Sequence, residues 1–306
     1  MSKSKLRFTD VSTEYMEFRK PELRPTTYAS YMHLLRRRII PVVGSIKIKN
    51  FNNDVLQGFI DVESAAGYGK HGIRDCVSII KLVLRYAADM KYGKYKIRTI
   101  KYHRGCSGMR REHSLTKDEY NKLLTYCIEN PGERTFPTLI AMTTGMRIGE
   151  VCGLKYGDVD YKNFTISVTR SVKRVCIPDM PSELEISSPK TQSSIRMVPI
   201  LPEVARLLER TGNSDEVYIS SGRDKPLEPR SYRAKYNRIL ARLGIEHHTF
   251  HDLRHTFASR SINSGADART VADILGHTNV EMTLNTYTHS TDESRRAAAM
   301  SACRMQ

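Results

Sequence analysis

Six side chains in the C-terminal part of the chain have the types needed to attack a phosphodiester without a metal ion. They are two arginines, a lysine, two histidines and a tyrosine, namely Arg147, Lys190, His251, Arg254, His277 and Tyr287. The transition state of such a reaction gathers negative charge on the non-bridging oxygens of the phosphate. Arginines can hold those oxygens by charge-assisted, often bidentate hydrogen bonds, so we predict this role for Arg147 and Arg254.

The other side chains can supply the nucleophile and the proton transfers. Tyr287 is the candidate nucleophile, but a tyrosine hydroxyl has a reference pKa of about 10 and needs help in losing its proton. His251 could take that proton. Lys190 could donate a proton to the departing 5′ oxygen, and His277 could add a hydrogen bond to the phosphate or to the tyrosine oxygen.

The neighbours of these residues favour a functional role, although each residue alone has an ordinary structural explanation. Arg147 stands among small and apolar residues in TTGMRIG, where a permanently charged guanidinium is costly unless an anion meets it. His251 and Arg254 are three residues apart, so they point the same way on one helix. Tyr287 follows His277 by ten residues and has polar neighbours.

The sequence indicates no cofactor and no metal. It has no GxxxxGK[ST] motif for nucleotide phosphates and no evident acidic cluster for two-metal hydrolysis. HDLRH differs from the HExxH zinc pattern, and a zinc site on His251 and His255 would lack a third ligand. The six cysteines form no CxxC pair, so we expect buried or idle thiols. Core packing remains the alternative explanation for the histidines.

Helical periodicity dominates the elements that must position these side chains. The spacing of Tyr28, Tyr31, Met32, Leu35 and Ile39 predicts an amphipathic helix that begins near Pro25 and is stopped by Pro41. Further helices fit residues 73–90, a start near 114–116, and residues 136–142, 202–211, 230–243, 250–263, 268–275 and 280–287, and short strands fit 163–168 and 195–200. We therefore expect a mainly α chain with a small antiparallel β-sheet, an α+β fold.

Composition divides the chain into a basic and a near-neutral part. Residues 1–103 are predicted to form a small helical domain, residues 104–113 a linker, and residues 114–306 a second domain. Of the net charge of +16, residues 1–113 carry most, with 23 Lys+Arg against 10 Asp+Glu. A basic domain beside a near-neutral one suggests that the basic domain binds a polyanion such as nucleic acid. A merely well-solvated surface would explain the charge equally well.

Six arginines of the basic part are the expected DNA contacts: Arg36, Arg37, Arg38, Arg104, Arg110 and Arg111. The last three lie in the linker, which could cross a phosphate backbone as a strap or be an ordinary solvated connector. The chain has no apolar run of about 18 residues and no N-terminal signal peptide. We therefore expect a cytoplasmic protein without a membrane partner.

Four segments resemble the motifs of the tyrosine recombinases, or phage-type integrases. TGMRIGE resembles the first arginine motif, PKTQSSIRMVPI the β-hairpin lysine region, HTFHDLRHTFAS the HxxR motif, and LGH with the tyrosine of NTYTH the last histidine and the nucleophile. The resemblance covers about residues 114–289. The segment RPTTYASYMHLLRRRIIPVVGSIKIKNF is similar, more weakly, to the helical core-DNA-binding domain of integrases from phages and integrative elements.

The resemblance implies a fold, an activity and partners. It implies a SAM-like core-DNA-binding domain at residues 1–103 and a tyrosine-recombinase catalytic domain at 114–306, with Glu150 supporting the first arginine. Family members recombine double-stranded DNA as tetramers on paired sites, through a 3′-phosphotyrosine intermediate and without ATP. We therefore expect a homo-tetramer that integrates or excises a mobile element, with an excisionase or a DNA-bending protein as potential accessory partners.

Several alternatives stay open at this point. The enzyme could be a DNA-relaxing enzyme of the type IB topoisomerase kind, or the chain could be a site-specific DNA-binding protein without catalysis. The core-binding pattern starts close to the N-terminus, so we expect no arm-binding domain. A recombinase that acts at core sites only and a shortened form of a longer protein fit equally well. The tail from Thr291 could dock on a neighbouring subunit or be a frayed terminus.

Overall fold

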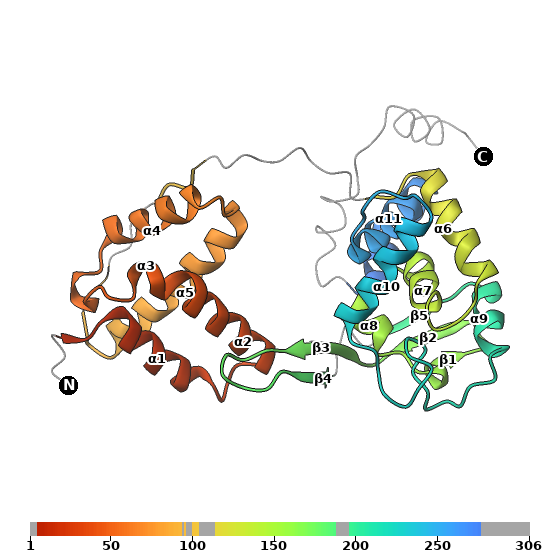
Figure 1. Cartoon of the computed structure of the whole chain (residues 1–306), viewed down its shortest axis with the longest axis horizontal. Coiled ribbons are helices and arrows are strands. Elements are labelled where there is room, and N and C mark those ends of the chain that lie inside the picture. The colour runs from red at the N-terminus through yellow and green to blue at the C-terminus, as the bar shows by residue number, and fades with distance from the viewer. Residues whose placement is uncertain (1–4, 94, 96–99, 104–113, 188–195, 277–306) are drawn as a thin grey trace, which may run out of the picture. The chain divides into compact units, whose positions relative to one another are not determined.

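The computed structural model describes residues 5–93, 95, 100–103, 114–187 and 196–276. These residues form two compact units (Figure 1), the first of which comprises the described residues up to 103 together with Val175–Glu183. The predicted linker 104–113, the predicted helix 280–287 and the residues Lys190, His277, Tyr287, Arg104, Arg110 and Arg111 lie outside the described residues. No helix in the described part is both long and apolar enough to span a membrane.

The first unit is a set of helices around one apolar core. Its elements are α1 (Phe8–Arg19), α2 (Pro25–Leu34), a π-helical turn (Leu35–Ile39), α3 (Ile40–Val43), a 3-10 turn (Ile48–Asn50), α4 (Asn53–Ala65) and α5 (Lys70–Asp89). Apolar side chains at helical spacing on α5, including Val77, Ile80 and Leu84, are buried in this core. The helix predicted at 73–90 is therefore confirmed.

The helix predicted from Tyr28 to Ile39 does not stop before Pro41, which corrects that part of the prediction. Helix α2 begins at Pro25 and continues through the π-helical turn into α3, which contains Pro41. A proline normally interrupts a helix because its ring collides with the carbonyl four residues earlier. In the π-helical turn, the Ile40 N–H bonds to the carbonyl of Leu35, five residues back. The wider turn leaves room for the proline ring, so the helical path continues.

From residue 114 onward, the described chain is again mostly helical. The helices are α6 (Lys117–Glu129), α7 (Phe136–Thr144), α8 (Ile148–Cys152), a 3-10 turn (Tyr156–Asp158), α9 (Pro202–Glu209), α10 (Pro229–Arg242), α11 (Phe250–Asn263) and α12 (Ala268–Leu275). A second apolar core, which includes Leu139, Ile140, Val198, Tyr232 and Leu253, fills this unit. Every helix predicted between residues 114 and 276 is found, with ends within a few residues.

In the described part of the chain, five short strands accompany these helices: β1 (Val159–Asp160), β2 (Thr165–Val168), β3 (Ser171–Val175), β4 (Glu183–Ser187) and β5 (Arg196–Pro199). Strands β1, β2 and β5 form an antiparallel sheet with β2 in the middle, in which Ile166 pairs with both Val159 and Val198. Strands β3 and β4 form a separate pair. The predicted fold class, mainly α with a small antiparallel sheet, is confirmed.

The described cysteines are free thiols. Cys76, Cys127 and Cys152 are buried and Cys176 is exposed. Burial raises the pKa of Cys76 to about 11 and the pKa values of Cys127 and Cys152 to about 12. A buried thiol with a raised pKa is a poor nucleophile, so these three contribute to packing.

Candidate active site

The turn between α7 and α8 sets the position of Arg147. Helix α7 ends at Gly145, which adopts a left-handed conformation with φ 67°, and Arg147 is the N-cap residue of α8. A Cβ atom on Gly145 would lie 2.5 Å from the side chain of Leu275 and 2.7 Å from that of Phe257. Only glycine satisfies both the backbone angle and this close approach, so TTGMRIG is a turn pressed against the end of α12.

The guanidinium of Arg147 is held on one side and open on another. Its Nη1 donates to Glu150 Oε1 at 2.9 Å, its Nη2 donates to the carbonyl of Gly276 at 3.4 Å, and its backbone N–H donates to Glu150 Oε2 at 3.0 Å. The side chain is still 41% exposed. An oriented guanidinium with an open face is suited to binding an anion.

Glu150 is the buried carboxylate at the centre of this group. It also accepts hydrogen bonds from Arg196, with Nη2 to Oε2 at 2.9 Å and Nη1 to Oε1 at 3.3 Å. Burial alone would raise the pKa of Glu150, but the hydrogen bonds and the charge of Arg196, followed by those of Arg147, outweigh it and hold the pKa below its usual value. Glu150 is therefore a carboxylate at neutral pH, so it can orient Arg147.

Helix α11 is fixed at its start by capping and by aromatic packing. The Asp252 carboxylate accepts the Thr249 backbone N–H at 2.6 Å, which closes the first turn. The Phe250 ring packs edge-on against Tyr232 and Tyr236, with ring centroids 5.7 and 5.3 Å apart. Both tyrosines belong to α10, so the helix that carries His251 and Arg254 is anchored in the core of the unit.

Arg254 lies in the interior, with 1% of its surface exposed. Its Nη1 donates to the carbonyl of Gly145 at 2.9 Å, and its Nη2 donates to the carbonyl of Leu275 at 2.8 Å. Arg147 donates to the carbonyl of the next residue, Gly276. The two predicted arginines are thus brought together, because they bind consecutive carbonyls at the end of α12.

The remaining predicted residues are placed less completely. His251 is exposed on the first turn of α11, and its ring meets that of His255 edge-on with centroids 4.8 Å apart. Lys190 lies in the connection between β4 and β5, outside the described residues. His277 and Tyr287 also lie outside them, and the described chain ends at Gly276.

A comparison with families of known proteins decides what kind of protein this is. The model described as the phage integrase family matches residues 113–294, which is more than half of the chain. The chain belongs to the phage integrase family. A second model, the phage integrase N-terminal SAM-like domain, matches residues 7–62.

Curated relatives of this integrase-family chain include recombinases and transposases. A tyrosine recombinase XerC-like protein from Caldanaerobacter subterraneus subsp. tengcongensis is 31% identical over 172 residues, covering 49% of this chain and 44% of that protein. The transposase from transposon Tn916 of Enterococcus faecalis is 28% identical over 207 residues, covering 60% of this chain and 49% of that protein. The chain thus matches about half the length of these relatives.

Solved integrase structures share the fold. The Tn1549 transposon integrase in complex with a circular intermediate DNA is 21% identical, with a TM-score of 0.78 over 97% of this chain and 100% of that chain. A lambda integrase tetramer bound to a Holliday junction is 17% identical, with a TM-score of 0.62 over 94% of this chain and 80% of that chain. At these identities the likeness concerns the fold.

The predicted DNA-contact arginines of the integrase N-terminal domain differ in their surroundings. Arg36 and Arg37 are exposed, although Arg36 also pairs with Asp179 at 2.5 Å. The Arg38 side chain is only 12% exposed, pairs with the buried Glu63 and stacks over the ring of Tyr68 at 3.9 Å. The guanidinium of Arg38 therefore has partners inside the unit, and a DNA contact by this residue stays a prediction.

Arg196 is a site residue that sequence reasoning missed. It lies inside the segment PKTQSSIRMVPI, from which Lys190 alone was selected. Strand alternation places Arg196 on the same face of β5 as the buried Val198. A charged residue on the buried face of a strand signals a buried partner, and this signal was available before the structure.

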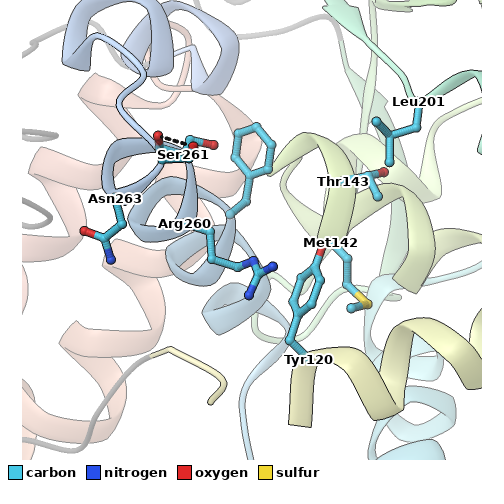
Figure 2. Close-up of a pocket in the computed structure, with 9 residues that line it drawn as sticks. Tyr120, Met142, Thr143, Leu201, Arg260, Ser261 and Asn263 are labelled. Atoms are coloured by element: carbon cyan, nitrogen blue, oxygen red, sulfur yellow. Dashed lines mark hydrogen bonds between the residues drawn. The ribbon is translucent and has the colours of Figure 1, made fainter. Parts of the chain in front are cut away.

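A separate hollow lies beside α11. It has a volume of about 510 Å³, and Figure 2 shows Tyr120 of α6 and Arg260 of α11 facing one another in it, with Met142 of α7 nearby. The Arg260 guanidinium lies 3.9 Å from the centre of the Tyr120 ring. Among the described residues, the predicted catalytic side chains Arg147, His251 and Arg254 do not line this hollow.

Proposed function

We propose that this chain is a site-specific DNA recombinase of the tyrosine type, which integrates or excises a mobile element through a 3′-phosphotyrosine intermediate. The observation that carries the proposal is the meeting of Arg147 and Arg254 at consecutive carbonyls of one helix end. Arg147, which is oriented by Glu150 and partly exposed, can contact the charge of a phosphoryl transition state, and the buried Arg254 adds positive charge to the same site. The family and the names of its relatives point to the same chemistry.

The reaction has a simple balance of bonds. The Tyr287 oxygen attacks the phosphorus, a tyrosine–phosphate bond forms, and the bond from phosphorus to the 5′ oxygen breaks. His251 takes the proton from the tyrosine, Lys190 gives a proton to the 5′ oxygen, and His277 hydrogen-bonds to the phosphate or the tyrosine oxygen. Attack by a 5′ hydroxyl on the phosphotyrosine reverses these steps and rejoins the DNA. Because the covalent bond keeps the energy of the broken phosphodiester, no ATP is consumed.

The proposal assigns partners to both parts of the chain. Residues 1–103 bind duplex DNA as a core-binding domain, with Arg36, Arg37 and Arg38 and the linker residues Arg104, Arg110 and Arg111 as phosphate contacts. Residues 114–306 form the catalytic domain. Four protomers act on two paired sites, and an excisionase or a DNA-bending protein can assist. The DNA-bound Tn1549 integrase and the lambda integrase tetramer on a junction support this assembly.

The test begins with finding a DNA substrate. Wild-type protein is mixed with a library of randomised duplexes that carry a central nick, and the DNA in detergent-resistant adducts is sequenced to give a selected duplex. Two copies of this duplex without the nick, of which one is labelled, are then incubated with the protein. We expect exchange of strands between the two copies.

The other outcomes identify the alternatives. Relaxation of a supercoiled plasmid without exchange between two sites would indicate a DNA-relaxing enzyme of the type IB kind. Specific binding without any covalent adduct would indicate a non-catalytic DNA-binding protein. Either result would contradict the proposed function.

A further inference from the structure

Arg196 occupies a central place among the residues of the candidate site. It is the first residue of β5, and its side chain is only 7% exposed. Its Nε donates to the carbonyl of Ile274 at 2.7 Å, in the last turn of α12, while Nη1 and Nη2 donate to the two oxygens of Glu150. One planar guanidinium therefore joins β5, α8 and α12.

The end of α12 is shaped to accommodate this side chain. Gly276 follows the last turn with φ 66°, and a Cβ atom there would lie 3.2–3.3 Å from three atoms of Arg196. That distance is tighter than an ordinary van der Waals contact, so a larger residue would push the guanidinium aside. The carbonyl of Gly276 also accepts a hydrogen bond from Arg147. A change at Gly276 that displaces Arg196 would therefore disturb Arg147 as well.

The negative charge of Glu150 explains why Arg196 is needed in addition to Arg147. Glu150 orients Arg147 by two hydrogen bonds, but a buried carboxylate at this distance also cancels much of the positive charge that Arg147 could offer to a phosphate. Arg196 contacts the same two carboxylate oxygens. With Arg196 in place, the negative charge of Glu150 is shared between two guanidiniums, so Arg147 keeps more of its positive charge for the DNA.

We propose that Arg196 is a positioning residue of this site, which neutralises Glu150 and ties it to the end of α12 so that Arg147 is both oriented and available to the scissile phosphate. The inference rests on the proposed function, because the phosphate is the substrate of that reaction. Arg196 itself acts through Glu150 and the Ile274 carbonyl rather than on the DNA.

Three variants, one of them double, separate this role from a purely structural one. Arg196→Met removes the charge and the hydrogen bonds but keeps much of the side-chain volume. Arg196→Lys keeps the charge and loses the fork that spans Glu150 and Ile274. The double variant Arg196→Met/Glu150→Gln removes the carboxylate charge that Arg196 is proposed to neutralise. Arg170→Met is the matched control, because Arg170 is an arginine of the same unit that pairs with a different carboxylate, Asp158, at 2.7 Å.

Single-turnover formation of the covalent adduct on the selected duplex, and binding to that duplex, are measured for each full-length variant. Because a misplacement of about 1 Å can cost roughly a hundredfold in rate, we expect Arg196→Met to form the adduct about tenfold to a hundredfold more slowly with nearly unchanged binding. Arg196→Lys should be intermediate, and Arg170→Met should match wild type. The double variant should be faster than Arg196→Met, because the neutral amide that replaces the Glu150 carboxylate no longer cancels the charge of Arg147.

Each contrary outcome has a distinct meaning. A wild-type rate in Arg196→Met, or a double variant slower than the single one, overturns the inference while leaving the proposed function intact. If Arg196→Met does not fold, the lysine variant decides: slower cleavage with intact binding supports the inference, and a wild-type rate overturns it. If wild-type protein forms no adduct on any duplex, the proposed function fails and the inference falls with it.

Discussion

Arg147 and Arg254 illustrate two ways in which one residue type serves a site. Arg254 is buried and bonded to two carbonyls, so it holds the turn of α7 and the end of α12 together as well as supplying charge. Arg147 is partly exposed and shares Glu150 with Arg196. The more exposed guanidinium is therefore the one whose substitution should affect chemistry with the least effect on folding.

We expect Arg147→Lys to slow cleavage much more than it weakens DNA binding. Lysine keeps the positive charge but loses the planar fork that holds two phosphate oxygens. An interaction made mainly in the transition state appears in the chemical rate rather than in affinity. Single-turnover cleavage and equilibrium binding of the selected duplex are compared, and equal losses in both, or cleavage at the wild-type rate, would mean that Arg147 has a structural role only.

Arg38 should behave differently from the adjacent arginines. Arg38→Ala leaves the buried Glu63 without its ion-pair partner, and breaking such a pair typically costs about 3–5 kcal/mol. Arg36→Ala and Arg37→Ala alter exposed side chains and should change stability little. Denaturant unfolding of the three variants measures this difference, and an Arg38→Ala variant as stable as the other two would show that the Glu63 pair is unimportant.

Residue types predicted part of the site and missed the rest for physical reasons. The motif around Arg147 predicted that the guanidinium needs an anion, and the family resemblance named Glu150 as its support; in the structure Arg147 donates to Glu150. The hydrogen bond between Arg196 and Glu150 joins residues 46 positions apart, and a local sequence pattern does not identify the partner of a residue at that distance. The environment of Arg38 was hidden for the same reason, because its partner Glu63 lies on another helix.

At the scale of elements, the helices with clear caps were predicted best. Helices at 250–263 and 268–275 have the predicted bounds, since Thr249 with Asp252 caps the first and Asp267 caps the second. Helices α1 and α4 were not predicted individually, although Leu56, Phe59 and Ile60 have helical spacing on α4. Strands β3 and β4 are short and largely polar, so they carry little of the alternating pattern that identifies a strand.

The packing of the turn after α7 against α12 can be tested by a substitution that adds one methyl group. Gly145→Ala introduces both an unfavourable backbone angle and a collision with Leu275 and Phe257. We expect it to lower stability and to slow cleavage, because the shifted end of α12 carries the carbonyls that hold Arg147 and Arg254.

Gly244→Ala is the matched control for this substitution. Gly244 has φ 62°, close to that of Gly145, but a Cβ atom there would meet no atom of the described residues within 4 Å. It should therefore cost only the backbone strain, of about 1 kcal/mol, and leave the cleavage rate unchanged. If both glycine variants lose cleavage equally, or neither does, the close packing of Gly145 against α12 does not support the site.

At the scale of the whole molecule, the uneven charge predicts how DNA binding depends on salt. The part of the chain up to residue 113 carries most of the net charge of +16, and counterion release gives a log–log salt slope of about −0.9 per phosphate contact. We expect Arg36→Gln and Arg37→Gln each to reduce the slope of the full-length protein by roughly that amount. Lys225→Gln, at an exposed lysine of the second unit, serves as the control. Salt slopes that do not change in the arginine variants would show that Arg36 and Arg37 do not contact the DNA phosphates.

The central claim is that Tyr287 becomes covalently joined to DNA, and one measurement tests it directly. Tyr287→Phe removes a single oxygen and keeps the ring, so folding and DNA binding should survive. Wild-type protein and this variant are incubated with the nicked selected duplex, resolved on a denaturing gel, and the adduct is mapped by peptide sequencing. The account predicts a wild-type adduct through a 3′ phosphate on Tyr287 and none in the variant. An adduct that persists in Tyr287→Phe, that maps to another of the 16 tyrosines, or that carries a 5′ linkage would contradict it.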